Sequence, residues 1–133
     1  MSMTANDILT DAFRTIKVLA GEETLGAAEQ VDGLRRMNNL MHGFGPKGIA
    51  YAHTTLAATD TVNVPDELVY SLIWLVAQAL APEYGYKFEA NEVAEIIEAK
   101  NALQAAYHVQ PIAQADPMLR PHRYGTYNIA TDR

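Results

Sequence analysis

One run of residues constrains the fold more than any other part of this 133-residue chain. It reads "LVYSLIWLVAQALA", residues 68–81, and Ser71 and Gln78 are its clearest polar side chains. A membrane span needs about 20 apolar residues, so a run this short predicts a buried helix instead. Because apolar side chains cover nearly all of its faces, we place this helix in the middle of a domain or in a subunit interface.

Proline and acidic residues mark where this helix begins. Pro65 suits a first helical turn, and Asp66 and Glu67 follow it where the helix dipole favours negative charge. We therefore predict a helix over residues 65–81.

The sequence predicts three more helices. The first begins at Thr4, which can cap it together with Asp7, and ends at Gly21. Its apolar positions recur at helical spacing: Ile8, Leu9, Ala12, Phe13, Ile16 and Leu19 or Ala20. The second helix covers residues 26–42, with an apolar stripe of Val31, Leu34, Met37 or Asn38, and Met41. The last is capped by Asn91, stops before Pro111 and carries Val93, Ile96, Ile97, Lys100, Leu103 and Tyr107.

The segment between the second and third predicted helices has a different period. "IAYAH" and "TVNV" are partly alternating and rich in β-branched or aromatic residues, which favours a short hairpin or an extended excursion. The predicted fold class is therefore mainly α: a bundle of about four helices with a short β excursion between helices two and three, and an extended C-terminal arm. The helical domain spans residues 1–110 and the arm residues 111–133.

Composition and charge narrow the class of protein. Hydrophobic residues make up 49% of the chain and charged residues 20%, which is ordinary for a globular domain and argues against wholesale disorder. The absence of cysteine excludes disulfides, thiolate zinc sites and cysteine nucleophiles. The start of the chain shows no signal-peptide pattern. Three arginines against two aspartates give residues 116–133 a charge of +1, so the total of −6 leaves −7 for residues 1–115. An acidic body does not suit a protein that grips DNA.

The C-terminal arm ends in "ADPMLRPHRYGTYNIATDR", which has no helical or strand period. Its prolines keep a segment extended and reduce the entropy lost on ordering. Arginine forks bind carboxylates, and aromatic residues dominate interface hot spots. We therefore predict an arm that becomes ordered on a partner. The predicted partner-binding residues are Arg120, His122, Arg123, Tyr124, Tyr127 and Ile129.

No motif predicts catalysis or a cofactor. "GFGPKG", residues 43–48, matches a dinucleotide-binding pattern in letters, but it follows a helix rather than a strand, so we interpret it as a helix end and turn. None of His42, His53, His108 and His122 lies three residues after a glutamate, and no H-E-x-x-H occurs, so we expect no metal site. The only serines are Ser2, at the terminus, and Ser71, on the apolar helix. We expect no cofactor, no catalytic residue and no enzymatic activity.

Four glutamates recur every three residues near the start of the last predicted helix: Glu89, Glu92, Glu95 and Glu98. A solvated helix face near a positive helix N-terminus is the simpler interpretation. The functional alternative is an acidic strip that faces a channel, which requires the protein to form a ring.

The order of these segments resembles a known family. It is similar to the tail accessory factor of P22-like short-tailed phages, also called the packaged-DNA stabilisation or head-completion protein. The most telling part is "ALAPEYG", residues 79–85, between the apolar helix and a helix with paired isoleucines, Ile96 and Ile97. The similarity covers about residues 4–109.

The resemblance implies a phage head-to-tail connector. Such proteins bind the dodecameric portal after DNA packaging, extend its channel, help retain the genome and offer a platform for the next tail protein, a nozzle or hub. The implied assembly is a ring of about twelve copies on the portal, in the neck of the virion, made in the host cytoplasm. DNA would pass through without specific binding, and no membrane is implied. The alternatives are a head-tail connector of another tailed-phage family and a small helical hydrolase of cell-wall glycan.

Overall fold

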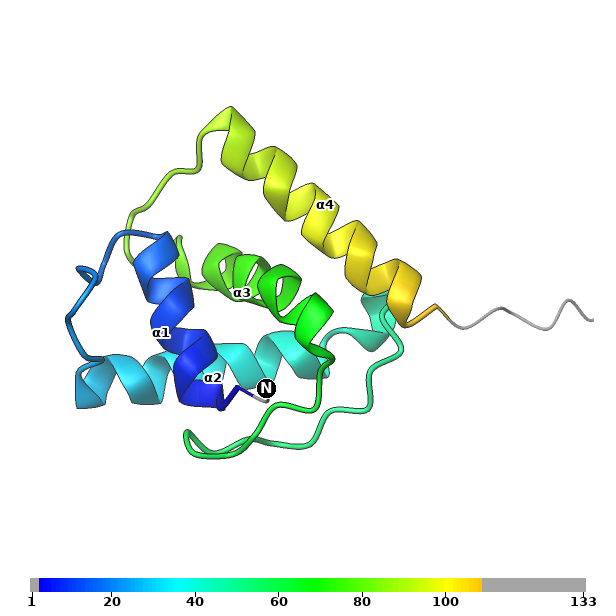
Figure 1. The fold of residues 1–133 in the computed structure, drawn as a ribbon, viewed down its shortest axis with the longest axis horizontal. Helices are drawn as coiled ribbons and strands as arrows, with labels where there is room; N and C mark the ends of the chain where they lie inside the picture. Colours follow the sequence, from blue (N-terminus) through cyan, green and yellow to red (C-terminus); the bar gives the residue numbers. More distant parts are fainter. Residues whose placement is uncertain (1–2, 109–133) are drawn as a thin grey trace, which may run out of the picture.

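The computed structural model describes residues 3–108. Four α-helices follow one another in this part of the chain: α1 (Ala5–Thr15), α2 (Ala27–His42), α3 (Asp66–Leu80) and α4 (Ala90–Ala106), with a short 3-10 helix, η1 (Gly45–Lys47), after α2 (Figure 1). The prediction of a mainly helical chain with four helices is confirmed. The predicted C-terminal arm, residues 111–133, lies outside the described residues.

Helix α3 occupies the centre of the molecule, as its sequence predicts. It packs against α1, α2 and α4, and Figure 1 shows it between α4 on one side and α1 and α2 on the other. Its buried residues, Val69, Ser71, Leu72, Leu75, Val76, Ala77 and Leu80, point to several sides of the helix. A helix with partners on three sides buries apolar groups all round, which explains the run of residues 68–81. None of the helices described here is long and apolar enough to cross a membrane.

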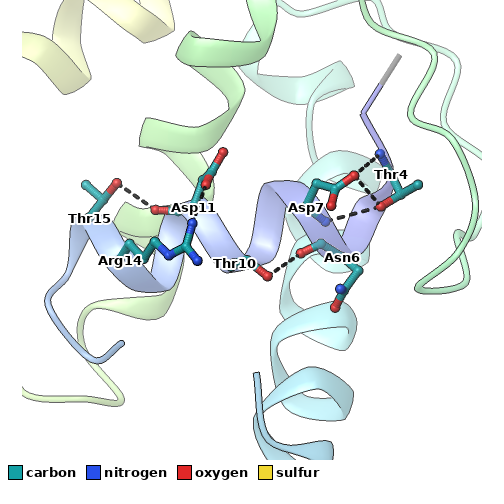
Figure 2. Close-up of polar contacts among 7 residues, drawn as sticks. All are labelled: Thr4, Asn6, Asp7, Thr10, Asp11, Arg14 and Thr15. Atoms are coloured by element: carbon teal, nitrogen blue, oxygen red, sulfur yellow. Dashed lines mark hydrogen bonds and ion pairs between the residues drawn. The ribbon is translucent and has the colours of Figure 1, made fainter. Parts of the chain in front are cut away.

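The N-terminus of α1 is held by its own side chains (Figure 2). The Asp7 N–H donates to Thr4 Oγ1 at 3.2 Å, and the Thr4 N–H donates to the Asp7 carboxylate at 3.0 Å. This reciprocal capping box was predicted and is confirmed. Because these bonds favour the charged carboxylate, the pKa of Asp7 lies below its ordinary value. Figure 2 also shows Thr10 and Thr15 bonding back to the carbonyls of Asn6 and Asp11.

Helix α1 ends before the predicted Gly21, at Thr15. Lys17 adopts a left-handed conformation with φ of 59°. The Lys17 N–H donates to the Arg14 carbonyl, and the Val18 N–H donates to the Phe13 carbonyl. This pair of bonds is a Schellman motif, which normally uses glycine at the left-handed position. The prediction placed the end at the glycine and was wrong because a lysine takes that role.

Helix α2 matches its predicted bounds, and its end matches the turn interpretation of "GFGPKG". Gly43 caps the helix C-terminus, and Gly48 is left-handed with φ of 81°. Met37, Asn38 and Met41 are buried, but Val31 is 67% exposed, so its predicted place in the apolar stripe is wrong. Helical spacing gives the direction of a side chain but does not say whether another element covers it there.

The predicted β excursion does not form a strand within the described residues. Between η1 and α3 the chain is irregular. It contains a turn in which the Asp60 N–H donates to the Ala57 carbonyl, and one isolated antiparallel bridge between Thr4 and Thr61. Its polar groups bond to helices instead of to a second strand. The Ala5 and Asn6 N–H groups, at the start of α1, donate to the Asp60 and Ala58 carbonyls. The segment therefore satisfies two N–H groups at the start of α1 that have no partner within the helix.

Helix α4 begins slightly earlier than predicted, with Glu89 at the N-cap rather than Asn91. The Glu92 carboxylate accepts a hydrogen bond from the Glu89 N–H at 3.2 Å, which fixes the first turn there. Ile96, Ala99 and Leu103 are buried, mainly against α3. Val93 and Ile97 stay 43% and 55% exposed, so the predicted apolar positions of this helix are only partly covered.

Candidate interaction surface

The four glutamates of the predicted acidic strip divide into two pairs. Each step of three residues falls short of a full helical turn by about 60°. Three such steps separate the first glutamate from the last, so these two point to opposite sides of the helix. Glu89 and Glu92 occupy the start of α4. Glu95 and Glu98 lie further along the helix, are exposed, and line a groove between α4 and α3.

Glu92 is committed to local structure. Its carboxylate accepts the hydrogen bond from the Glu89 N–H and also lies 2.9 Å from the Tyr86 hydroxyl. The pKa of Tyr86 is raised above its ordinary value, chiefly because its hydroxyl donates to this carboxylate. Glu89 is exposed at the N-cap, so of the four predicted positions Glu95 and Glu98 are the pair that lines the groove.

The groove between α3 and α4 is defined by Tyr70, Ser71, Glu95, Glu98, Ala99 and Ala102, and its volume is about 270 Å³. Its floor is made of small side chains, because alanines on α4 face α3 and leave room between the helices. Ser71 lies at the bottom and is only 8% exposed. We call this space the α3/α4 groove.

An apolar hollow adjoins the α3/α4 groove. It is lined by Met3, Asp66, Val69, Tyr70 and Ile73, and Tyr70 belongs to both spaces. Tyr70 is 60% exposed, and its ring meets the single tryptophan, Trp74, edge to face at 6.2 Å between centroids. Acidic and apolar groups thus lie side by side, joined by an exposed aromatic ring. Sequence reasoning missed this pairing, because only the packing of α4 on α3 brings Glu95 and Glu98 beside Tyr70.

The segment that carries the family resemblance, residues 79–85, forms the corner between α3 and α4 (Figure 1). Arg36 of α2 places its Nε 2.5 Å from a Glu83 carboxylate oxygen and bonds the Ala79 carbonyl through Nη1. Tyr84 packs edge to face on Phe13 of α1 at 5.2 Å between centroids. Gly85 has φ of 68°, which suits glycine and lets the chain turn toward α4. One short segment therefore fastens α1, α2 and α3 together.

Two of the histidines meet at a second cluster. The rings of His42 and His53 lie edge to face, 4.4 Å apart between centroids, and His53 Nε2 lies 2.9 Å from Asn38 Oδ1. Asn38 also binds the segment between η1 and α3. Its Oδ1 accepts a hydrogen bond from the Leu56 N–H, and its Nδ2 donates one to the Leu56 carbonyl. The pKa of His53 is lowered, first by burial and then by repulsion from His42. Spacing could not reveal this cluster, because its members lie on a helix and on an irregular loop.

The described residues contain no group of three or more side chains suited to hold a metal ion. His108 is exposed at the end of the described part of the chain. The predicted partner-binding residues lie outside the described residues: Arg120, His122, Arg123, Tyr124, Tyr127 and Ile129. Their role stays a prediction.

Comparison with known proteins adds no family. No protein-family model matches the sequence. A search of curated proteins finds no similar chain.

Proposed function

We propose that this chain is a phage head-to-tail connector that binds the portal ring after DNA packaging and extends the DNA channel. In this role it helps to retain the genome and offers a platform for the next tail protein. It works as a ring of about twelve copies on the portal, in the neck of the virion, and has no catalytic activity of its own.

The observation that carries the proposal is the corner of residues 79–85. These residues are the most telling part of the resemblance to the tail accessory factors of short-tailed phages. They are also the residues that join three helices, through the Arg36–Glu83 ion pair and the contact of Tyr84 with Phe13. A segment that organises the whole bundle is a stronger basis for a family resemblance than a surface motif would be.

Charge gives a second support. Residues 1–115 carry a net charge of −7, and Glu95 and Glu98 are exposed on one helix. DNA binds proteins mainly through its phosphates, so an acidic body repels it. This repulsion suits a conduit through which DNA must pass without being held.

Electron microscopy of portal rings mixed with the chain tests the proposal. We expect an added layer of about twelve copies on the portal ring. The matched control is the full chain with Tyr124→Ala and Tyr127→Ala, which should add much less protein, because aromatic anchors dominate interface energies at roughly 2 kcal/mol or more each. A portal ring that gains no layer at saturating protein contradicts the proposal.

Two measurements on the isolated chain complete the test. We expect sedimentation to show a monomer or a weak association, because the ring forms only on the portal. A stable dodecamer in isolation would contradict assembly on the portal. Glycan cleavage by the pure protein, abolished by a single Glu→Gln change, would instead favour the hydrolase alternative.

A further inference from the structure

We propose that residues 119–129 of the arm dock in the α3/α4 groove of their own chain. In this arrangement Arg120 and Arg123 both face Glu95 and Glu98, and an aromatic ring of the arm packs against Tyr70. The inference goes beyond the proposed function, since it holds whatever partner the arm later binds.

The groove and the hollow beside it suit an occupant that carries both positive charge and apolar side chains. Glu95 and Glu98 present carboxylates on one wall, and the neighbouring hollow presents apolar side chains such as Val69 and Ile73. Tyr70, between them, is 60% exposed. Ser71 also lines the groove and is 8% exposed.

The arm has the matching chemistry. Residues 116–133 carry +1 on an otherwise acidic chain, Arg123 stands directly beside Tyr124, and Arg120 lies three residues before Arg123. Arginine binds carboxylates through two parallel N–H groups, and tyrosine combines an apolar ring with a polar tip. No other stretch of the sequence combines a positive net charge with this density of tyrosine and arginine.

The residues that join α4 to the docking segment keep that segment close to the groove of its own chain. Eight residues separate Glu98 from Ala106, the last residue of α4, which is about 12 Å along the helix. Residues 107–119 can span roughly 40 Å when extended, so Arg120 reaches Glu98 with slack to reverse direction. A short tether gives an effective concentration in the millimolar range. Weak contacts therefore suffice in the same molecule, whereas a second copy must compete from dilute solution.

Disulfide trapping in the full chain tests this docking, because the sequence contains no cysteine. The test variant carries Glu98→Cys and Arg123→Cys, and the control carries Lys100→Cys and Arg123→Cys. Lys100 is exposed and lies two residues away on the same helix, but points about 160° away from Glu98. The α4 thiol of the test variant and that of the control are thus tethered to Arg123→Cys by nearly the same length of chain. Only the thiol at position 98 faces the groove.

In a glutathione redox buffer, we expect the test variant to form at least about tenfold more intramolecular disulfide than the control. Adding Arg120→Glu to the test variant should bring its yield toward that of the control. Equal yields for the test and control variants, or a yield that Arg120→Glu leaves unchanged, would overturn the proposal. So would disulfides that join two chains and increase with protein concentration, since these would place the arm on a second copy. Circular dichroism verifies that each variant is folded.

Discussion

At the scale of single residues, Asn38 and His53 form the contact with the clearest pH dependence. Asn38 Oδ1 accepts the Leu56 N–H, so it also acts as the acceptor for His53, which must then carry its proton on Nε2. His53 Nδ1 is buried and has no partner among the described residues. Protonation of this nitrogen would place an unpaired charge in a buried position beside His42.

The first prediction follows from the lowered pKa of His53. The unfolded chain takes up a proton near the ordinary pKa of 6.5, and the folded chain does so only at lower pH. The unfolded state therefore binds more protons in that window, and stability is lost as the pH falls from about 6.5 toward the folded pKa. Urea unfolding at about pH 7.5 and about pH 5 should show a smaller loss in His53→Gln than in the natural chain.

The exposed His108 provides the control, since His108→Gln should leave the pH dependence unchanged. His42→Gln should reduce the loss in part, because it removes the repulsion but not the burial. Equal pH dependence in His53→Gln and the natural chain would show that other groups cause the acid sensitivity.

The second prediction concerns Lys17, whose φ of 59° is costly for a residue with a side chain. Lys17→Gly should raise the free energy of unfolding by about 1 kcal/mol, because glycine suits the left-handed position of a Schellman motif. Lys17→Ala is the control: it loses the same contact of Lys17 Nζ with the Tyr86 ring but keeps the strain. A glycine variant no more stable than the alanine variant would contradict this explanation of how α1 ends.

At the scale of elements, the contact between α1 and α2 depends on one glycine. A Cβ at Gly33 would lie 3.0 Å from Phe13 Cε2 and 3.2 Å from Leu9 Cδ2. The two helices therefore approach closely only because α2 has no side chain there.

The third prediction is that Gly33→Leu lowers the free energy of unfolding by about 1–3 kcal/mol, the usual cost of overpacking a core. Leucine favours helices more than glycine, so any loss must come from the clash and not from helix propensity. Ala28→Leu on the exposed side of the same helix should change stability by about 0.5 kcal/mol or less. Chemical denaturation of both variants measures the difference. A stable Gly33→Leu protein would mean that α1 can move away.

Helix positions could be predicted from the sequence, but their ends and the loop could not. Apolar spacing located all four helices, and the capping box of Thr4 and Asp7 was visible as a pattern. The end of α1 was missed because a lysine replaces the expected glycine. The β excursion was predicted from β-branched residues, yet its backbone bonds the start of α1 and the side chain of Asn38. Composition indicates an extended chain but cannot say which groups it will bond.

At the scale of the whole molecule, the candidate surface could be predicted only in part. The glutamates of α4 were recognised as a set, but their division into a capping pair and a groove pair follows from helix geometry and from the contact of Glu92 with Tyr86. The exposed ring of Tyr70 was hidden in an apolar run. Which face α4 covers depends on the segment that links α3 to α4, residues 81–89, and a periodic pattern does not encode the angle between the two helices.

The last prediction concerns the part that the arm plays in the stability of the whole molecule. In the part of the chain that the structure describes, the buried apolar residues lie between Ala5 and Leu103 and belong to the four helices and the segments that join them. Deleting Leu119–Arg133 should therefore leave the helical circular dichroism signal per helical residue unchanged and lower the free energy of unfolding by less than about 2 kcal/mol. The same deletion should remove most portal binding, because a segment that orders on a partner contributes to affinity more than to folding.

A longer deletion provides the control. Ending the chain after Glu95 removes Ile96, Ala99 and Leu103, which pack against α3, and should unfold the protein. Urea unfolding and portal binding are measured side by side for the full chain and both truncated chains. If the shorter deletion also unfolds the bundle, the arm is part of the fold. If folding and portal binding both survive it, the arm serves another partner, either the next tail protein or a neighbouring subunit.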